Sequence, residues 1–164
     1  MSPPPLFLGL NRYLWKLAVL GYGIGYFADG MEMYLLSLIQ EDIEEEWNMS
    51  ATDLGMVEGI VFIGMAVGAF GWGVAADRLG RLPIIRFNIV MATILSFCSA
   101  ASRSALVMGL LRFGFGLSIG GFVPVGGTLL AECTAEGEEG ITMALAGQFF
   151  TLGGILESLI AIPV

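Results

Sequence analysis

Five long apolar segments, separated by short polar stretches, occupy almost the whole sequence. They cover residues 14–39, 54–76, 84–101, 105–131 and 141–164. A helix that crosses a bilayer needs about 20 mostly apolar residues, and each segment has roughly that length. The composition agrees, because 56% of the residues are hydrophobic and only 13% are charged, against roughly 25% charged in an average soluble domain. The sequence therefore predicts an all-α membrane protein with about five transmembrane helices.

The distribution of Lys and Arg predicts the orientation in the membrane. Basic residues flank the start of the first segment and fill the stretch between the second and third: Arg12, Lys16, Arg78, Arg81 and Arg86. The stretch between the first and second segments contains neither Lys nor Arg. Cytoplasmic loops carry the excess of Lys and Arg, so we expect residues 1–13 to form a cytoplasmic N-terminal segment and residues 40–53 to face outward. The lipid bilayer is accordingly an expected partner.

Several classes of function are disfavoured by the composition. The formal net charge is -8 and the basic residues form no stripe, so binding to nucleic acid is not expected. The chain has no His and only 2 Cys, which removes the usual metal ligands, so we expect neither a metal nor another cofactor. No pairing of a nucleophile with a base is in view, so no catalytic residue is assigned and an enzyme is not expected.

Two carboxylates lie within the first apolar segment. Asp29 and Glu32 are three residues apart and therefore share one face of a helix. A charge at the middle of a bilayer costs about 2.5–3.5 kcal/mol, so two of them require a polar cavity, a partner or a proton. We interpret the pair as a candidate proton or cation site, with Asp29 as the deeper residue. The alternative for Glu32 is a position from which it reaches the outer headgroups.

Two further ionisable residues lie at membrane depth. Arg112 in the fourth segment either reaches the interface or makes an interior contact, and Gly116 and Gly120 on its helix face favour the interior. Glu157 in the fifth segment is a site candidate because intramembrane ionisable residues are rare and costly. Whether Glu157 faces a cavity stays open at this point.

Small residues and a proline indicate how the helices pack. Glycines at four-residue spacing allow helix backbones to approach closely. The packing candidates are Gly64, Gly68, Gly73, Gly80, Gly116 and Gly120. Pro124 interrupts the hydrogen bonding of the fourth segment, which is tolerated where neighbouring helices or a cavity satisfy the freed carbonyl.

A compact charged turn, residues 73–83, lies between the second and third segments. It holds two arginines, one aspartate and two glycines. Such a stretch is too short for a soluble domain and too charged for hydrocarbon. We expect it to be a tight cytoplasmic elbow between two membrane-spanning helices.

Two motifs resemble those of the major facilitator superfamily of membrane transporters. The elbow, Gly73-x-x-x-Asp77-Arg78-x-Gly80-Arg81, is similar to the superfamily's signature between its second and third helices, and Arg112-x-x-x-Gly116 looks like its fourth-helix motif. Within the superfamily, Asp29-Gly-Met-Glu32 and the stretch from Gly120 to Glu132 resemble the synaptic vesicle 2-related and organic-ion transporter group.

The resemblance implies transport of a small organic or ionic solute by alternating access. It implies that Asp29, Glu32 and Arg112 take part in substrate or proton coupling. It also implies a cytoplasmic charge network that includes Asp77, Arg78, Arg81 and Glu132. The fifth segment lacks the Gly-Pro signature of drug/proton antiporters, which favours a symporter or a uniporter.

The superfamily has twelve helices in two halves. The resemblance therefore implies that this chain is a fragment, a partial N-terminal six-helix bundle that lacks the C-terminal half. The expected partners are the missing half, a small-molecule or ion substrate and protons. A receptor or scaffold that has the same fold but does not transport is the alternative.

Overall fold

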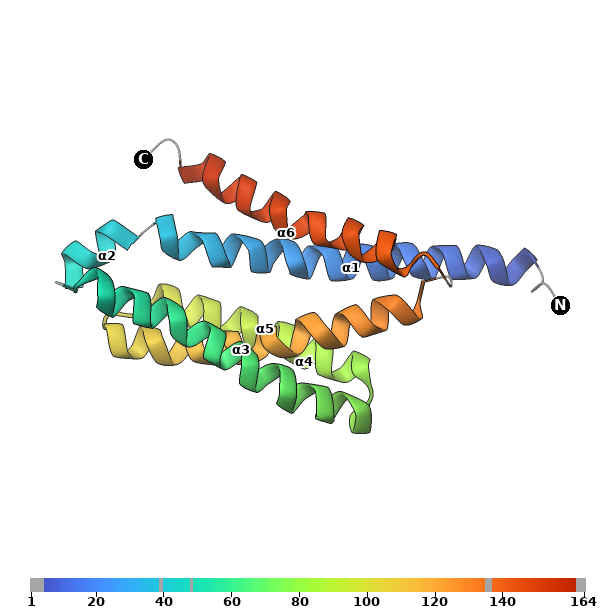
Figure 1. Cartoon of the computed structure of the whole chain (residues 1–164), viewed down its shortest axis with the longest axis horizontal. Coiled ribbons are helices and arrows are strands. Elements are labelled where there is room, and N and C mark those ends of the chain that lie inside the picture. Colours follow the sequence, from blue (N-terminus) through green and yellow to red (C-terminus); the bar gives the residue numbers. More distant parts are fainter. Residues whose placement is uncertain (1–4, 39, 48, 135–136, 162–164) are drawn as a thin grey trace.

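The computed structural model describes residues 5–38, 40–47, 49–134 and 137–161, which form six helices joined by short turns (Figure 1). The helices are α1 (Pro5–Leu38), α2 (Gln40–Trp47), α3 (Ala51–Leu79), α4 (Arg81–Ala100), α5 (Ala105–Glu132) and α6 (Glu139–Ala161). The described ranges contain no β-strand, so the predicted all-α class is confirmed.

Four helices, α3 to α6, are long and apolar enough to cross a membrane. The longest helix, α1, has 34 residues but carries Lys16, Asp29 and Glu32, and it is not among these four. The membrane-spanning helical architecture is therefore supported by α3 to α6. The predicted first span, residues 14–39, stays a prediction, and residue 39 lies outside the described residues.

Several helix ends differ from the predicted ones. Helix α1 begins at Pro5 rather than at residue 14, so most of the predicted N-terminal segment is helical. The stretch expected to be an outer loop contains the eight-residue helix α2. It also contains the start of α3, where Ser50 accepts a hydrogen bond from the Asp53 amide and the Asp53 side chain accepts one from the Ser50 amide. This reciprocal cap satisfies amide groups that the first turn of a helix leaves free. Residues 162–164 lie outside the described part of the chain.

The charged elbow is shorter than expected. Helix α3 continues through Asp77 and Arg78 to Leu79, and α4 begins at Arg81. Only Gly80 separates the two helices, with φ of 89°. This left-handed backbone conformation favours glycine because a side chain would be strained there. The charged residues therefore lie on helix ends rather than in a turn of several residues.

The five long helices form two groups (Figure 1). Helices α3 and α4 both pack closely on α5, while α6 packs on α1. Contacts between the groups, α1 with α5 and α5 with α6, are much sparser. The molecule is thus a three-helix group and a two-helix group that meet along α1 and α5.

Glycines close the seam between α3 and α5. Backbone atoms of the partner helix fill the place that a Cβ would take at Gly64, Gly68, Gly116 and Gly120. Gly64 faces the backbone of Phe113 and Leu117, and Gly116 faces the carbonyl oxygen of Val61. By contrast, Gly73 has open space beside it and takes no part in this seam.

The seam between α1 and α6 is built in the same way. Gly153 faces the backbone of Phe27 and Met31, and Gly30 faces the carbonyl oxygen of Phe150. The contacting positions of the two seams correspond. Phe27 and Gly30 of α1 are related by one constant difference in residue number to Phe113 and Gly116 of α5. A second constant difference relates Phe150 and Gly153 of α6 to Val61 and Gly64 of α3. The packing of α1 with α6 therefore repeats the packing of α5 with α3.

Candidate functional site

A cavity of about 240 Å³ lies between α1, α4 and α5. Asp29 and Glu32 line it from α1, Asn88 and Ser96 from α4, and aromatic rings from α5. Helices α1 and α4 approach each other little, so the cavity occupies the space between the two helix groups.

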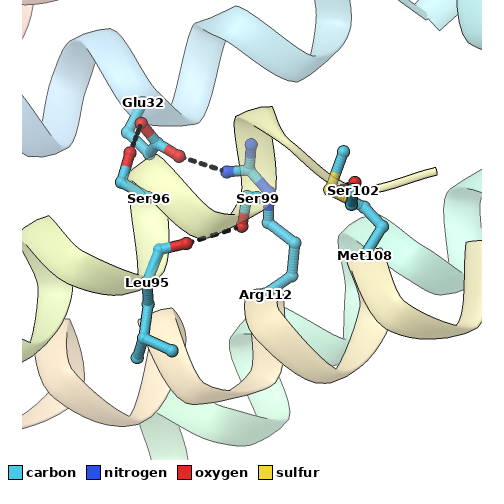
Figure 2. Close-up of polar contacts among 7 residues, drawn as sticks. All are labelled: Glu32, Leu95, Ser96, Ser99, Ser102, Met108 and Arg112. Carbon is cyan, nitrogen blue, oxygen red and sulfur yellow. Dashed lines mark hydrogen bonds and ion pairs between the residues drawn. The ribbon is translucent and has the colours of Figure 1, made fainter. Parts of the chain in front are cut away.

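Glu32 and Arg112 form an ion pair across this space (Figure 2). Arg112 Nη1 lies 2.7 Å from Glu32 Oε1, and the Ser96 hydroxyl donates to Glu32 Oε2 at 2.8 Å. The Arg112 side chain is 4% exposed and that of Glu32 is 13% exposed. Glu32 therefore faces the protein interior rather than the headgroups, and Arg112 makes the interior contact. Both carboxylate oxygens of Glu32 have a partner.

Asp29 lines the same cavity without such a partner. It is 5% exposed, and its Oδ1 is buried with no hydrogen-bond partner among the described residues. Arg112 is already paired with Glu32, so an ionised Asp29 would be a buried charge without a compensating partner, which is costly. A proton or a cation beside Asp29 would remove this cost.

Asn88 is a cavity residue that the sequence analysis missed. It is fully buried, and both Nδ2 and Oδ1 lack a hydrogen-bond partner within the described ranges. Gly121 makes room for it, because the place of a Cβ at Gly121 is taken by Asn88 Nδ2 and the Trp72 ring. Leaving a buried polar atom unpaired costs about 1–3 kcal/mol. In the sequence, Asn88 is visible only as one uncharged amide within the apolar segment 84–101, and an amide stands out less than a charged residue.

A second ion pair joins the elbow to the end of α5. Arg81, the first residue of α4, pairs with Glu132, the last residue of α5. Asp77 lines the shallow groove beside them, and Arg78 is exposed. Neither Asp77 nor Arg78 forms an ion pair in the described part of the chain. The structure thus brings together two of the four residues expected in the charge network.

Glu157 lies away from the cavity. It is buried on α6, four residues after Gly153, as Gly68 on α3 lies four residues after Gly64. Glu157 is not among the residues that line this cavity. By position it corresponds to Gly68 of the α3/α5 seam, where the partner backbone leaves no room for a side chain, so the two seams differ at this point.

Helix α5 continues through Pro124. Pro124 lines a second cavity together with Tyr22 and Tyr26. Next to it, the Tyr22 hydroxyl donates to the Val123 carbonyl at 2.9 Å, and the Thr128 hydroxyl donates to the Pro124 carbonyl at 2.6 Å. The proline therefore lines a cavity, whereas the carbonyl that it leaves without a helical donor is that of Gly120, four residues earlier, on the side that packs against α3.

These features define an integral, multi-pass helical membrane protein with a buried ion pair beside a partly polar cavity. No group of three or more His, Cys, Asp or Glu in the described ranges could hold a metal ion. The polar side chains that line the cavity are two carboxylates, one amide and two hydroxyls, from Asp29, Glu32, Asn88, Thr93 and Ser96.

The chain belongs to the Major Facilitator Superfamily, whose family model matches residues 22–162. It is 33% identical to NiaP of Bacillus subtilis, provisionally named a niacin/nicotinamide transporter, and 33% identical to Organic cation/carnitine transporter 7 of Arabidopsis thaliana; both matches cover 94% of the chain. It is 29% identical to human Synaptic vesicle glycoprotein 2A over 93% of the chain. These matches confirm the resemblance to the synaptic vesicle 2-related and organic-ion transporter group. The chain spans 39%, 30% and 20% of the lengths of these three relatives.

Proposed function

We propose that the protein containing this chain is a secondary carrier that moves a small organic or ionic solute by alternating access, with proton coupling through Asp29. The observation that carries the proposal is the cavity between the helix groups. It contains an unpaired carboxylate, Asp29, beside a paired one, Glu32. A charge without a partner at membrane depth is costly, so this cavity favours a state in which a proton or cationic solute is bound.

The Glu32–Arg112 pair supports the choice of Asp29, rather than Glu32, as the carboxylate that takes up the proton. Arg112 pairs with Glu32, whose second oxygen accepts from Ser96. Asp29 lines the same cavity as Glu32, so the negative charge of Glu32 makes ionisation of Asp29 more costly. A proton on Asp29 leaves the cavity with one negative and one positive group, which balance.

Arg81 and Glu132 supply a second element of the mechanism. Their ion pair joins the start of α4 to the end of α5 on the side that we infer to be cytoplasmic, with Asp77 and Arg78 beside it. We assign this charge network the role of holding one of the two alternating states. Its opening would accompany exposure of the cavity to the other side.

The relatives support a carrier rather than an enzyme. One is named for organic cations and carnitine and another for niacin or nicotinamide. Because the chain spans only part of each relative's length, we propose that further helices of the same protein supply the rest of the solute path.

Uptake into proteoliposomes tests this function. The protein, expressed from its complete reading frame, should take up members of a panel of labelled cations, amines and carboxylates, and uptake should respond to an imposed pH gradient. Asp29→Asn should remove the response to the gradient, whereas Glu45→Gln, an exposed change on α2, should retain it. An unaltered proton response in Asp29→Asn would rule out the proton site, and absence of uptake across the panel would rule out the carrier.

A further inference from the structure

We infer that Glu58 on α3 is a second carboxylate partner of Arg112 and holds its guanidinium group when Glu32 moves away. The inference rests on the proposed carrier function and adds a positioning residue to it. Its basis is that Glu58 Oε1 and Arg112 Nε are both buried without a hydrogen-bond partner among the described residues. The two residues lie on helices that pack closely, α3 and α5.

The register of the α3/α5 seam places Glu58 at the level of Arg112. Gly116 faces the carbonyl oxygen of Val61, and four residues further along both helices the same kind of contact recurs, so the two helices run parallel. One helical turn before this contact, Arg112 of α5 lies beside Val57 of α3, the neighbour of Glu58. Val57 is buried in an apolar cluster that α3 and α5 share, so the seam extends to this level.

Glu58 lies on the side of α3 that faces α1. Val61 and Met65 follow it by three and seven residues, so the three side chains share one helix face. Val61 is part of an apolar cluster against which Met65 packs, and Met33 of α1 packs against the same cluster. Met33 directly follows Glu32. Glu58 is therefore turned toward the helix that carries Glu32.

Arg112 lies on the matching side of α5. Ile119, seven residues later, shares its helix face and belongs to the same apolar cluster. This cluster marks the side of the seam on which Arg112 and Glu58 both lie. The axes of packed helices are about 8–10 Å apart, a span that the side chains of an arginine and a glutamate bridge together. Arg112 thus has one carboxylate on each of two helices, Glu32 on α1 and Glu58 on α3.

The two carboxylates belong to different helix groups. Arg112 and Glu58 lie within the three-helix group, whereas Glu32 lies on α1 of the two-helix group. The Glu32–Arg112 pair therefore crosses the sparse boundary between the groups and breaks when they separate. A buried guanidinium group without a carboxylate is costly. Because α3 and α5 are held by their glycine seam, Glu58 stays with Arg112 and offsets this cost.

The guanidinium group can exchange one acid for the other. Its Nη1 donates to Glu32, while its Nε has a donor that no described residue uses. Glu58 Oε1 is an acceptor on the neighbouring helix. The exchange requires rotation of the Arg112 side chain and leaves the number of charges in the protein unchanged.

Unfolding of the full-length protein by SDS titration in mixed micelles tests the contact. Glu58→Gln alone should change the unfolding equilibrium constant by less than about twofold, because Glu32 holds Arg112. In a Glu32→Gln background the same change should raise the constant about tenfold, because Arg112 then loses its second partner. Adding Arg112→Met to that background should abolish the tenfold effect. An equal effect of Glu58→Gln in all three backgrounds would overturn the inference.

Uptake kinetics test the positioning role with single variants only. For a solute that the wild-type protein carries, Glu58→Gln should lower kcat about tenfold and leave KM unchanged, because Arg112 has no partner when Glu32 leaves. Glu58→Asp keeps the charge and should retain most of the wild-type kcat. Glu45→Gln removes an exposed carboxylate of α2 and, as the matched control, should behave like the wild type. A wild-type kcat in Glu58→Gln would overturn the positioning role.

The inference and the carrier function fail separately, because the unfolding measurement needs no solute. Coupling between Glu58 and Arg112 without uptake of any solute would support the contact and overturn the carrier. Uptake by a protein in which Glu58 and Arg112 show no coupling would overturn the contact and leave the carrier standing.

Discussion

The buried pair of Glu32 and Arg112 shows why ionisable residues in an apolar helix are informative. Each residue alone would be an expensive charge in the membrane. Their contact spans 80 positions of the sequence and offsets part of the desolvation of both. Attraction between two buried charges need not exceed the cost of burying them, but removing one partner always exposes the other to that cost.

Replacing one member of this pair should therefore destabilise the protein strongly. Arg112→Met should lower the free energy of unfolding by about 3–5 kcal/mol, because Glu32 is left buried without its cation. The double variant Glu32→Leu with Arg112→Met should recover most of this loss. Unfolding by SDS titration in mixed micelles measures both. A double variant that is less stable than either single variant would contradict this account.

The sequence was sufficient to select Asp29, Glu32 and Arg112, because charges stand out in an apolar segment. It was insufficient to show that Arg112 pairs with Glu32 and leaves Asp29 alone, since that depends on how α1 rotates against α5. Asn88 was missed for a related reason, because an amide carries no charge and its lack of partners is visible only in the packed structure.

At the scale of the helices, glycine decides which surfaces meet. Gly64 and Gly116 sit where the backbones of α3 and α5 touch, and no side chain fits there. Gly73 lies five residues after Gly68 rather than four, and it faces open space. The glycines of this segment predicted a packing face but could not show where along the helix the contact ends. The sequence likewise predicted a longer turn at the elbow than the structure contains. The charged residues Asp77 and Arg78 remain helical, and the helix is broken only at Gly80.

Alanine substitutions on α3 distinguish these two kinds of glycine. Gly64→Ala should lower stability by about 1–3 kcal/mol, because its Cβ would overlap the backbone of α5. Gly73→Ala should leave stability unchanged or raise it by up to about 1 kcal/mol, since alanine favours the helix. Melting curves from tryptophan fluorescence report both changes. Equal losses at the two positions would show that Gly73 is also packed.

At the scale of the whole molecule, the ion pair of Arg81 with Glu132 places the elbow and the end of α5 on one side of the membrane. Helix α2 and the start of α3 lie at the other end of α3. The Lys and Arg distribution indicates that the elbow side is cytoplasmic. This orientation makes opposite predictions for a cysteine beside Glu132 and for one on α2.

Labelling with a membrane-impermeant maleimide tests the orientation. In a Cys98→Ala background, Cys133, which is half-buried next to Glu132, should react only after the membrane is permeabilised. A cysteine introduced by Glu45→Cys on α2, in a background that also lacks Cys133, should react in intact cells. The reverse pattern would invert the orientation, and detergent-treated membranes give the full signal for comparison.

The equivalence of the two glycine seams has one more consequence. The shift that matches Gly30 with Gly116 and Phe27 with Phe113 also matches Glu32 with Ser118 and Tyr26 with Arg112. The close backbone contacts therefore recur in both seams, but the charges do not, because the carboxylate of Glu32 lies on α1 and the guanidinium of Arg112 lies on α5. Neither seam alone contains the ion pair, which forms only between α1 of one seam and α5 of the other.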